Sequence, residues 1–440
     1  MTRANTYPTI CFSAFVLWLT VIVMDGPLLL AAGIPDASNF FLPAHILFLL
    51  VIGLFCPPAI FRTLAPVNCV LTVILTLSIP LAGWPVNHYL LVAAGACGAF
   101  VAINACTALR QSPAPLLSAA CGLVIANILF IPFGIWADDG VVLFAAATLP
   151  LLSIPVLVRH LPEPEPAPDT PRLWHYLFFI FIFQIISGLM YAFIMPAYQD
   201  SAILPGFELL FYMGGIGAAY LLAREKRDLA MVLAVILGMV AFTLLQGGNP
   251  AWINLGMFAM MGGAGIIDLV FISVLLSAAA PIRGFGVGLA VFCAGILGGK
   301  IIGVYYSDMT GAIIMTGHLV LNLSVIALYF HGRQYYTAAL SEPEALLPKS
   351  ECVPIPPIDT DLVMPDNQNT AADPIPEHWR MLLSEREYEV FKMVAAGRTY
   401  RETGHELEIS ESTVKTYMSR IYEKVGVKGK KQLFDKLKKS

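Results

Sequence analysis

The chain has 440 residues, of which 58% are hydrophobic and only 13% are charged, and its formal net charge is −4. Its mean hydropathy is +0.74. A soluble globular protein carries roughly a quarter charged residues, because its surface has to face water. The composition therefore excludes an ordinary soluble protein and indicates an integral membrane protein.

Apolar runs long enough to cross roughly 30 Å of hydrocarbon follow one another between Pro8 and Phe330. They predict an all-α membrane domain over residues 1–335, with about twelve transmembrane helices in two six-helix halves, 1–160 and 174–333. The expected spans are 9–31, 41–61, 67–84, 88–109, 115–136, 140–159, 174–196, 205–223, 229–246, 252–279, 285–306 and 310–330.

The charges in the connecting loops predict the orientation. If the N-terminus is cytoplasmic, alternate loops hold every lysine and arginine and the loops between them hold none, as the positive-inside rule requires. Both termini are then expected in the cytoplasm, with the protein in the inner membrane of a bacterial cell. The cytoplasmic basic residues are Arg3, Arg62, Arg110, Arg159, Arg172, Arg224, Lys226, Arg227, Arg283 and Arg333.

The two halves are separated by a proline- and acid-rich segment, residues 162–169, which we expect to be an extended linker. This six-plus-six arrangement with a cytoplasmic linker resembles the topology of the major facilitator transporters over about 330 residues. The resemblance implies transport as an alternative function. The glycine-acid-arginine signature of that family is missing, because the loop at 61–66 reads FRTLAP.

Four charged residues fall inside or near the ends of predicted spans: Asp25, Glu208, Asp268 and Lys300. Such groups are costly at membrane depth and normally face the protein interior or a water-filled cavity. We expect Lys300 to pair with Asp268. The alternatives are a ligand or proton site between the two halves and a structural ion pair.

Weaker signals lie on the seventh and the eleventh predicted spans. Gln184 is a polar residue in a span, and a lone amide there more often ties helices together than binds a ligand. Gly295, Gly299 and Gly303 place small residues on one face of a span, which predicts close helix packing.

The composition changes after Arg333. Residues 341–377 contain eight prolines and eight acidic residues against a single lysine, with no periodic apolar stripe. We therefore expect a disordered tether over residues 336–377, followed by a domain over residues 378–440.

The last domain begins with a helix that Ser384 and Glu387 cap together and that Gly397 ends. A second helix is expected from Thr399 to Leu407, and Ser410 caps a third, residues 411–425. In the third helix, the apolar residues at helical spacing predict a core face, and the polar residues Lys415, Thr416, Ser419 and Arg420 lie opposite. The core residues are Val414, Met418, Ile421 and Val425.

This stretch resembles the LuxR/NarL-type helix-turn-helix domain, a four-helix DNA-binding unit. The resemblance rests on Leu-Ser-x-Arg-Glu from Leu383, Ile-Ser-x-x-Thr-Val-Lys from Ile409 and Lys-x-Gly-Val from Lys424, and it covers about 58 residues. Departures from the pattern are Tyr400, Thr403, Gly404 and Tyr417.

The resemblance also implies residue roles on double-stranded DNA. Lys415, Thr416 and Ser419 are expected to face base edges, and Thr413, Arg420 and Lys424 to touch phosphates. It implies a homodimer formed through the last helix, residues 432–437, on a palindromic operator.

No nucleophile–base pair, phosphate loop, receiver or kinase motif is recognisable, so we expect neither catalysis nor a cofactor. The eight cysteines form no CxxC pair, so no metal site or disulfide framework is expected. The favoured hypothesis is a membrane-anchored, one-component transcription regulator whose membrane domain detects a small molecule. The alternatives are a transporter with a regulatory tail and a regulator released by proteolysis.

Overall fold

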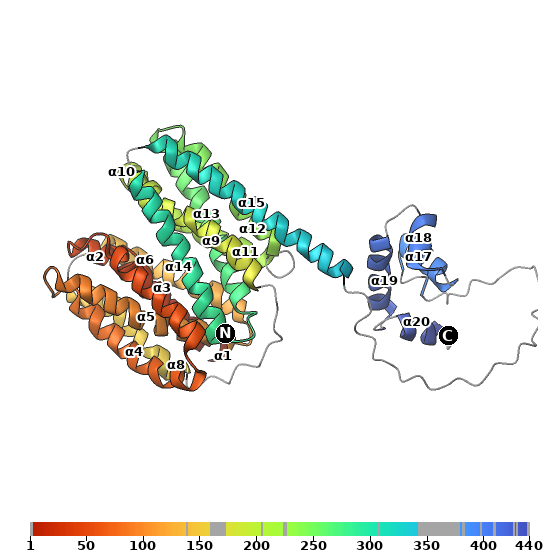
Figure 1. The fold of residues 1–440 in the computed structure, drawn as a ribbon, viewed down its shortest axis with the longest axis horizontal. Coiled ribbons are helices and arrows are strands. Elements are labelled where there is room, and N and C mark those ends of the chain that lie inside the picture. The colour runs from red at the N-terminus through yellow and green to blue at the C-terminus, as the bar shows by residue number, and fades with distance from the viewer. Residues whose placement is uncertain are drawn as a thin grey trace, which may run out of the picture. The chain divides into compact units, whose positions relative to one another are not determined.

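A computed structural model describes residues 3–437 of the protein apart from 138–139, 159–172, 204–205, 223–226, 307–308, 342–378, 381–382, 397, 408–410, 426 and 428–429. All regular structure in the described residues is helical. The chain divides into two compact units, Met1–Leu346 and Leu347–Ser440 (Figure 1).

The first half of the larger unit begins with a long, interrupted helix. A π-helical segment, η1, lies between the α-helices α1 and α2. The elements of this half are α1 (Arg3–Trp18), η1 (Leu19–Val23), α2 (Pro27–Ala31), α3 (Ala37–Phe55), α4 (Pro58–Ser78), α5 (Val86–Arg110), α6 (Pro115–Ile135), α7 (Val141–Thr148), the short 3₁₀ helix η2 (Leu149–Leu152) and α8 (Ser153–Val158).

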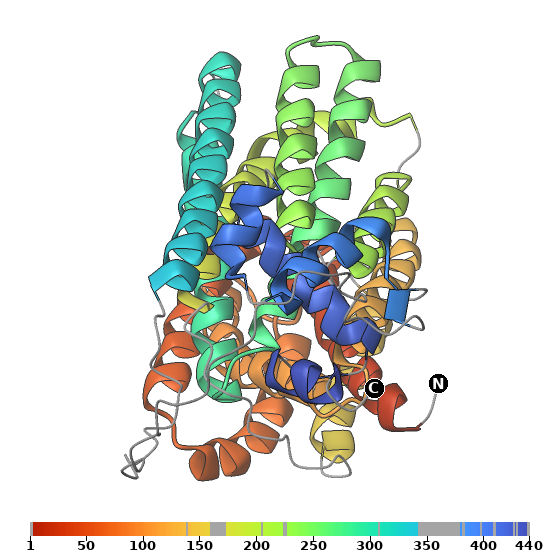
Figure 2. The same ribbon diagram turned by 90° about the vertical axis from the view of Figure 1, so that its right-hand side faces the viewer.

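The second half also begins with a helix that a π-helical segment interrupts. Its elements are α9 (Leu173–Leu189), η3 (Met190–Ile194), α10 (Met195–Ser201), α11 (Glu208–Leu222), α12 (Arg227–Leu245), α13 (Pro250–Leu275), α14 (Pro281–Tyr305) and α15 (Thr310–Ser341). Figure 2 shows α12 and α13 running side by side, and the two helices pack against each other.

Each of the twelve predicted spans overlaps a helical segment, but the second and third are shifted, because the predicted loop at 61–66 lies within α4. Ten segments, of 18 to 27 residues, are long and apolar enough to cross a membrane, and two more, Glu208–Leu222 and Gly311–Ile326, are shorter. The described chain is therefore a multi-pass helical membrane protein with ten to twelve crossing helices. The predicted linker at residues 162–169 lies outside the described residues.

Proline starts many of these helices. Pro27, Pro58, Pro115, Pro250 and Pro281 each stand in the first turn of a helix. There the missing backbone N–H costs no intrahelical hydrogen bond, and the fixed φ suits the helix. Proline thus marks where these five helices begin.

Helix α14 joins the two halves, because it packs against α9 of its own half and α3 of the first half. The predicted close packing at its glycines is confirmed. A Cβ on Gly299 would lie 2.0 Å from the carbonyl oxygen of Ile185 in α9, and one on Gly286 would lie 2.6 Å from the Cα of Gly53 in α3. The backbones therefore approach as closely as small residues allow.

The predicted start of the tether is wrong. The sequence assigned residues 336–341 to the tether, but α15 continues to Ser341. The first proline after Arg333 is Pro343, so nothing before it prevents a helix. The rest of the predicted tether, residues 342–377, lies outside the described residues.

The smaller unit contains the four expected helices, α17 (Glu385–Ala395), α18 (Tyr400–Glu406), α19 (Glu411–Val425) and α20 (Lys430–Leu437). The predicted core face of α19 is confirmed, since Val414, Met418, Ile421 and Val425 are all buried. They pack with Trp379, Leu383, Val390, Phe391, Val394 and Leu433 in one apolar core.

Candidate functional site

The helices of the smaller unit are held at their N-termini by two capping boxes. The predicted one is present: Glu387 N donates to Ser384 Oγ over 3.4 Å, and Ser384 N donates to Glu387 Oε2 over 2.8 Å. A second, which the sequence analysis missed, joins Thr399 and Glu402 in the same way. Its signal is the Thr-x-x-Glu spacing. Hydrogen bonds from Thr399 hold the pKa of Glu402 below its usual range. Gly397 and Ser410, the other expected terminal residues, lie outside the described residues.

Glu387 also binds α19. Its Oε2 accepts from Lys424 Nζ at 2.6 Å, and the Glu387 side chain is 5% exposed while that of Lys424 is 41% exposed. Burial is the largest influence and raises the pKa of Glu387, but the hydrogen bonds from Lys424 and Ser384 together outweigh it and leave the pKa below its usual range. The ion pair therefore fixes α17 against α19. A phosphate contact by Lys424, as the resemblance implies, would be shared with this carboxylate.

The face of α19 opposite the core is polar and exposed. Lys415, Thr416, Ser419 and Arg420 are exposed, and Thr413 is half-buried. Val414 and Met418, which alternate with them, are fully buried. The helix thus presents ammonium, guanidinium and hydroxyl groups along one side, fixed by a rigid core behind it. These groups suit base edges and phosphates in a major groove.

Three of the four departures from the family pattern, Tyr400, Thr403 and Gly404, lie in α18. The hydroxyls of Tyr400 and Tyr422 lie 2.8 Å apart and form a hydrogen bond. Burial, and then this hydrogen bond, raise the pKa of Tyr422. Thr403 and Gly404 are buried, and Thr403 Oγ1 has no hydrogen-bond partner among the described residues. These three departures therefore lie away from the exposed face of α19, while the fourth, Tyr417, is half-buried on α19 itself.

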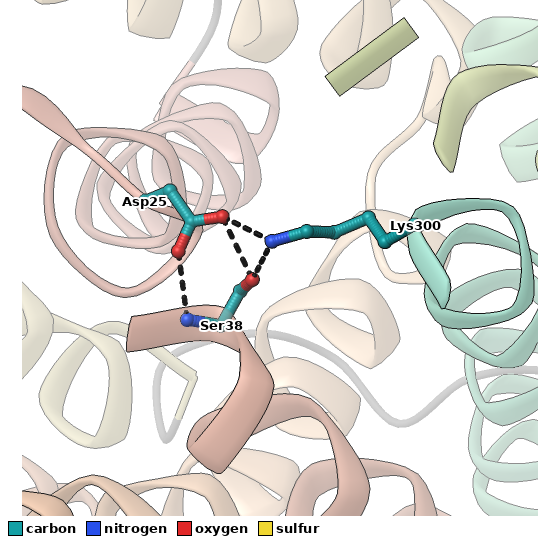
Figure 3. A network of polar contacts seen from close by, with 3 residues as sticks. All are labelled: Asp25, Ser38 and Lys300. Carbon is teal, nitrogen blue, oxygen red and sulfur yellow. Dashed lines mark hydrogen bonds and ion pairs between the residues drawn. The ribbon is translucent and has the colours of Figure 1, made fainter. Parts of the chain in front are cut away.

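In the membrane unit, Lys300 joins the two halves (Figure 3). Its Nζ, on α14, bonds Asp25 Oδ2 after η1 and Ser38 Oγ on α3, and the residue is 6% exposed. Ser38 N and Oγ also donate to the two Asp25 oxygens, each over 2.8 Å. The carboxylate, the ammonium and the hydroxyl therefore form one closed network.

The expected Lys300–Asp268 pair is wrong, because Lys300 binds Asp25 instead. The reason is tertiary. Asp25 has a left-handed backbone, with a φ of 53°, and its carboxylate bonds the first turn of α3, where an anion is favoured by the helix dipole. Helix α14 packs on α3 and brings Lys300 to the same place.

Asp268, on α13, lies in a different group of polar side chains. Its Oδ2 accepts a 2.7 Å hydrogen bond from the hydroxyl of Tyr212 on α11. Gln184 on α9 also faces this carboxylate. Tyr191, in η3, lies within electrostatic reach of both Asp268 and Asp25. The structure thus brings three of the four expected charged residues to neighbouring positions where the halves meet.

Glu208, the fourth, stands apart from that group. It is the first residue of α11 and accepts a 2.7 Å hydrogen bond from the hydroxyl of Tyr198 on α10. Its contacts are those of a residue that ties two neighbouring helix ends together.

A second polar contact joins the halves near the other end of α14. Arg110, the last residue of α5, donates to the carbonyl oxygen of Ala278, which precedes α14. Lys300 lies near the far end of this helix. At 1.5 Å per residue the two contacts are roughly 30 Å apart. The interface between the halves is therefore bonded near both ends of α14.

The two π-helical segments lie beside these groups. Segment η1 ends two residues before Asp25, and η3 contains Tyr191, so the first long helix of each half carries one. Such segments appear mostly as single turns within α-helices and frequently at functional sites. No pattern in the sequence predicted these π-helical segments.

Comparisons with known proteins separate the two units. Residues 381–437 match the family described as "Bacterial regulatory proteins, luxR family". The spore germination protein GerE of Bacillus subtilis (strain 168) is 45% identical over 51 residues, which make up 12% of this chain and 69% of that protein.

The similar solved structures cover the membrane unit. A bacterial homologue of the iron transporter ferroportin, in an outward-facing state with soaked iron, has a TM-score of 0.52 and 12% identity over 75% of this chain and 98% of its own. The human organic anion transporter MFSD10 has a TM-score of 0.52 and 13% identity, over 74% of this chain and 99% of its own. The fucose:proton symporter FucP of E. coli has a TM-score of 0.51 and 10% identity, over 75% of this chain and 97% of its own.

At these identities the likeness shows the fold alone, which is that of the major facilitator transporters. The capping boxes, the buried core and the exposed basic face of α19 agree with the match over residues 381–437. Through this C-terminal domain, the chain belongs to the luxR family of bacterial regulatory proteins, here joined to a multi-pass membrane domain with a transporter-like fold.

Proposed function

We propose that the protein is a membrane-anchored, one-component transcription regulator. The membrane domain detects a small molecule, and the C-terminal domain binds a palindromic operator as a homodimer. The protein lies in the cytoplasmic membrane of a bacterium with both termini inside, so the DNA-binding domain reaches the chromosome. The observation that carries the proposal is the exposed polar face of α19 on a luxR-family domain in the same chain as a membrane bundle.

On DNA, α19 enters the major groove with its buried face held by the domain core. Lys415, Thr416 and Ser419 read base edges, while Thr413 and Arg420 contact phosphates and set the register of the helix. The phosphate contacts make affinity dependent on salt, whereas the base contacts make it dependent on sequence. The proposal assigns no catalysis to the chain.

In the membrane, the interface between the halves is the two-state element. A ligand that binds one arrangement of the halves better than the other shifts the population between them. The Lys300–Asp25–Ser38 network is the contact that has to form or break in such a change, because it joins α14 to the first half. Helix α15 leads from the bundle toward the DNA-binding domain in the sequence and carries the change onward.

In vitro selection from random double-stranded DNA tests the proposal with the intact chain in lipid nanodiscs. Enrichment of a palindromic sequence is expected, and Lys415→Ala should weaken binding to it about tenfold or more, because a base contact contributes roughly 1–3 kcal/mol. Arg386→Ala is the control, since Arg386 lies on α17 and pairs with Glu389 rather than belonging to the α19 face. Recovery of unselected DNA only would contradict the proposal.

The fold of the membrane domain favours one other function, a transporter with a regulatory tail. Its test is the accumulation of solutes in vesicles that contain the protein. Accumulation that Lys300→Ala abolishes and Lys415→Ala does not would support transport. Under the favoured proposal, neither variant changes the solute content of the vesicles.

A further inference from the structure

The polar group around Asp268 is built from four separate elements of the second half. Asp268 lies on α13, Tyr212 on α11, Gln184 on α9 and Tyr191 in η3. The Tyr212 hydroxyl donates to the Asp268 carboxylate at 2.7 Å. Side chains that converge from four elements on one carboxylate are typical of a site within a helical bundle.

The charges of this region do not balance. Lys300 is the only lysine or arginine in the interior of a predicted span, and its ammonium is bound by Asp25 and Ser38. Among the described residues, Asp268 accepts a hydrogen bond from the Tyr212 phenol, and the Gln184 amide faces it; neither group carries positive charge. A carboxylate at membrane depth is unfavourable without a positive partner. The Asp268 group therefore has no positively charged partner among the described residues.

Gln184 gives an independent sign of a missing partner. It is 1% exposed, and it faces Asp268. Yet neither its Nε2 nor its Oε1 makes a hydrogen bond of acceptable geometry with any described residue. Buried amides are nearly always hydrogen-bonded in proteins, so one left open beside a carboxylate calls for another group.

We propose that the Asp268 group binds a small organic ammonium cation, which is the molecule that the membrane domain detects. This ligand class deepens the proposed function and rests on it. The Asp268 carboxylate supplies the counter-charge, and the carbonyl oxygen of Gln184 accepts an ammonium N–H. The rings of Tyr191 and Tyr212 attract the cation through their faces. An anion would meet the carboxylate and is excluded.

The position of Tyr191 connects this site to the contact between the halves. Its side chain lies within electrostatic reach of both Asp268 and Asp25. A cation bound beside it attracts Asp25 and repels the ammonium of Lys300. Binding therefore weakens the Lys300–Asp25 bond and favours the arrangement of the halves in which this contact is open.

The test measures binding to the intact chain in nanodiscs by titration calorimetry and by the midpoint of thermal unfolding. The probes are phenethylamine, its neutral analogue phenethyl alcohol and its anionic analogue phenylacetate. Only the amine should bind and raise the midpoint, since a ligand stabilises the state that it binds. Equal binding of the alcohol or of phenylacetate would overturn the proposal, and so would the failure of all three probes to bind.

Variants locate the binding. Asp268→Asn should weaken phenethylamine binding by about tenfold or more, whereas Asp268→Glu, which keeps the charge, should retain most of it. Asp228→Asn is the matched control, because Asp228 accepts a 3.3 Å hydrogen bond from the hydroxyl of Tyr176 and is another tyrosine–aspartate pair of the same half. Unchanged binding by Asp268→Asn, with the expected size-exclusion profile, would overturn the proposal. If Asp268→Asn does not fold, Asp268→Glu decides instead, and a loss of phenethylamine binding by that variant would overturn the proposal.

Two further outcomes separate this inference from the proposed function. If Na⁺ raises the unfolding midpoint through Asp268 and phenethylamine does not, the site takes an inorganic cation and the organic ligand is wrong. If phenethylamine binds through Asp268 but the chain selects no DNA sequence, the site stands and the regulator fails. If DNA is selected and no cation binds, the regulator stands and the site fails.

Discussion

Glu387 shows how one residue can fix several parts of a small domain. Its carboxylate closes the capping box with Ser384 and binds Lys424 on α19. The capping role follows from the Ser-x-x-Glu spacing and was predicted. The ion pair was not predicted, because Glu387 and Lys424 are 37 positions apart and only the packing of α17 on α19 brings them together.

The variant Glu387→Gln should destabilise the contact between α17 and α19 by about 1–2 kcal/mol at neutral pH. Gln keeps an acceptor but loses the charge, and the figure is at the low end because Lys424 is partly exposed. Hydrogen exchange of the α17 and α19 amides in the intact protein measures it, with roughly five- to thirtyfold faster exchange expected.

The pH dependence of this difference has a definite sign. The pKa of Glu387 is lower in the folded domain than its usual value. Its stabilising effect is therefore present above the usual pKa of glutamate and is lost as pH falls through the lowered value. Exchange rates corrected for intrinsic pH effects should converge between wild type and Glu387→Gln in acid. A difference that persists there would contradict this account.

Thr403 provides a prediction of the opposite sign. Its Oγ1 is buried without a partner among the described residues, so the hydroxyl is a cost that a methyl group of similar size removes. Thr403→Val should stabilise the α18–α19 contact by about 1 kcal/mol, seen as slower hydrogen exchange in α18. Faster exchange would show that Oγ1 has a partner that stabilises the fold.

At the scale of helices, the sequence predicts that a helix is present better than it predicts where the helix ends or which neighbour it faces. The hydrophobic runs located the ten long apolar helical segments and the two shorter ones, and the core face of α19 followed from its helical spacing. The end of α15 was missed because nothing before Pro343 prevents a helix. The partner of Lys300 was also missed, because adjacency of spans in sequence does not determine which helix α14 faces.

The glycines of α14 give the test at this scale. Gly299→Ala places a Cβ 2.0 Å from the Ile185 carbonyl oxygen in α9, so the two helices must move apart. We expect a loss of about 1–3 kcal/mol, visible as a lower midpoint of thermal unfolding in nanodiscs. Gly298→Ala is the control, because nothing lies within 4 Å of its added Cβ. Equal effects of the two variants would contradict close packing at Gly299.

At the scale of the whole molecule, signalling depends on the contact between the halves. The sequence placed four charges at membrane depth, with a site between the halves as one alternative. In the structure Lys300 and Asp25 join the halves, and Tyr191 lies within electrostatic reach of both Asp25 and Asp268. The pairing of these charges depends on how the halves pack and had to come from the structure. The membrane fold is that of transporters, while the chain's family membership comes from its last domain.

Charge reversal tests whether the Lys300–Asp25 bond controls the output. Lys300→Asp and Asp25→Lys should each fix transcription of the target genes at one level, whatever the ligand, because like charges then hold the halves apart. The double variant restores opposite charges and should recover part of the response. Reporter expression with and without ligand measures it. A double variant no better than either single one would show that the pair does not act through its charge.

The central claim is that this membrane protein reads specific DNA sequences in the cell. Its most direct test is genome-wide DNA occupancy by the intact protein, compared with Lys415→Ala produced at the same level. Discrete occupied sites next to genes whose transcripts change, with both lost in the variant, are the expected result. Occupancy without discrete sites, or sites that Lys415→Ala keeps unchanged, would contradict the assignment of α19 as the recognition helix of a regulator.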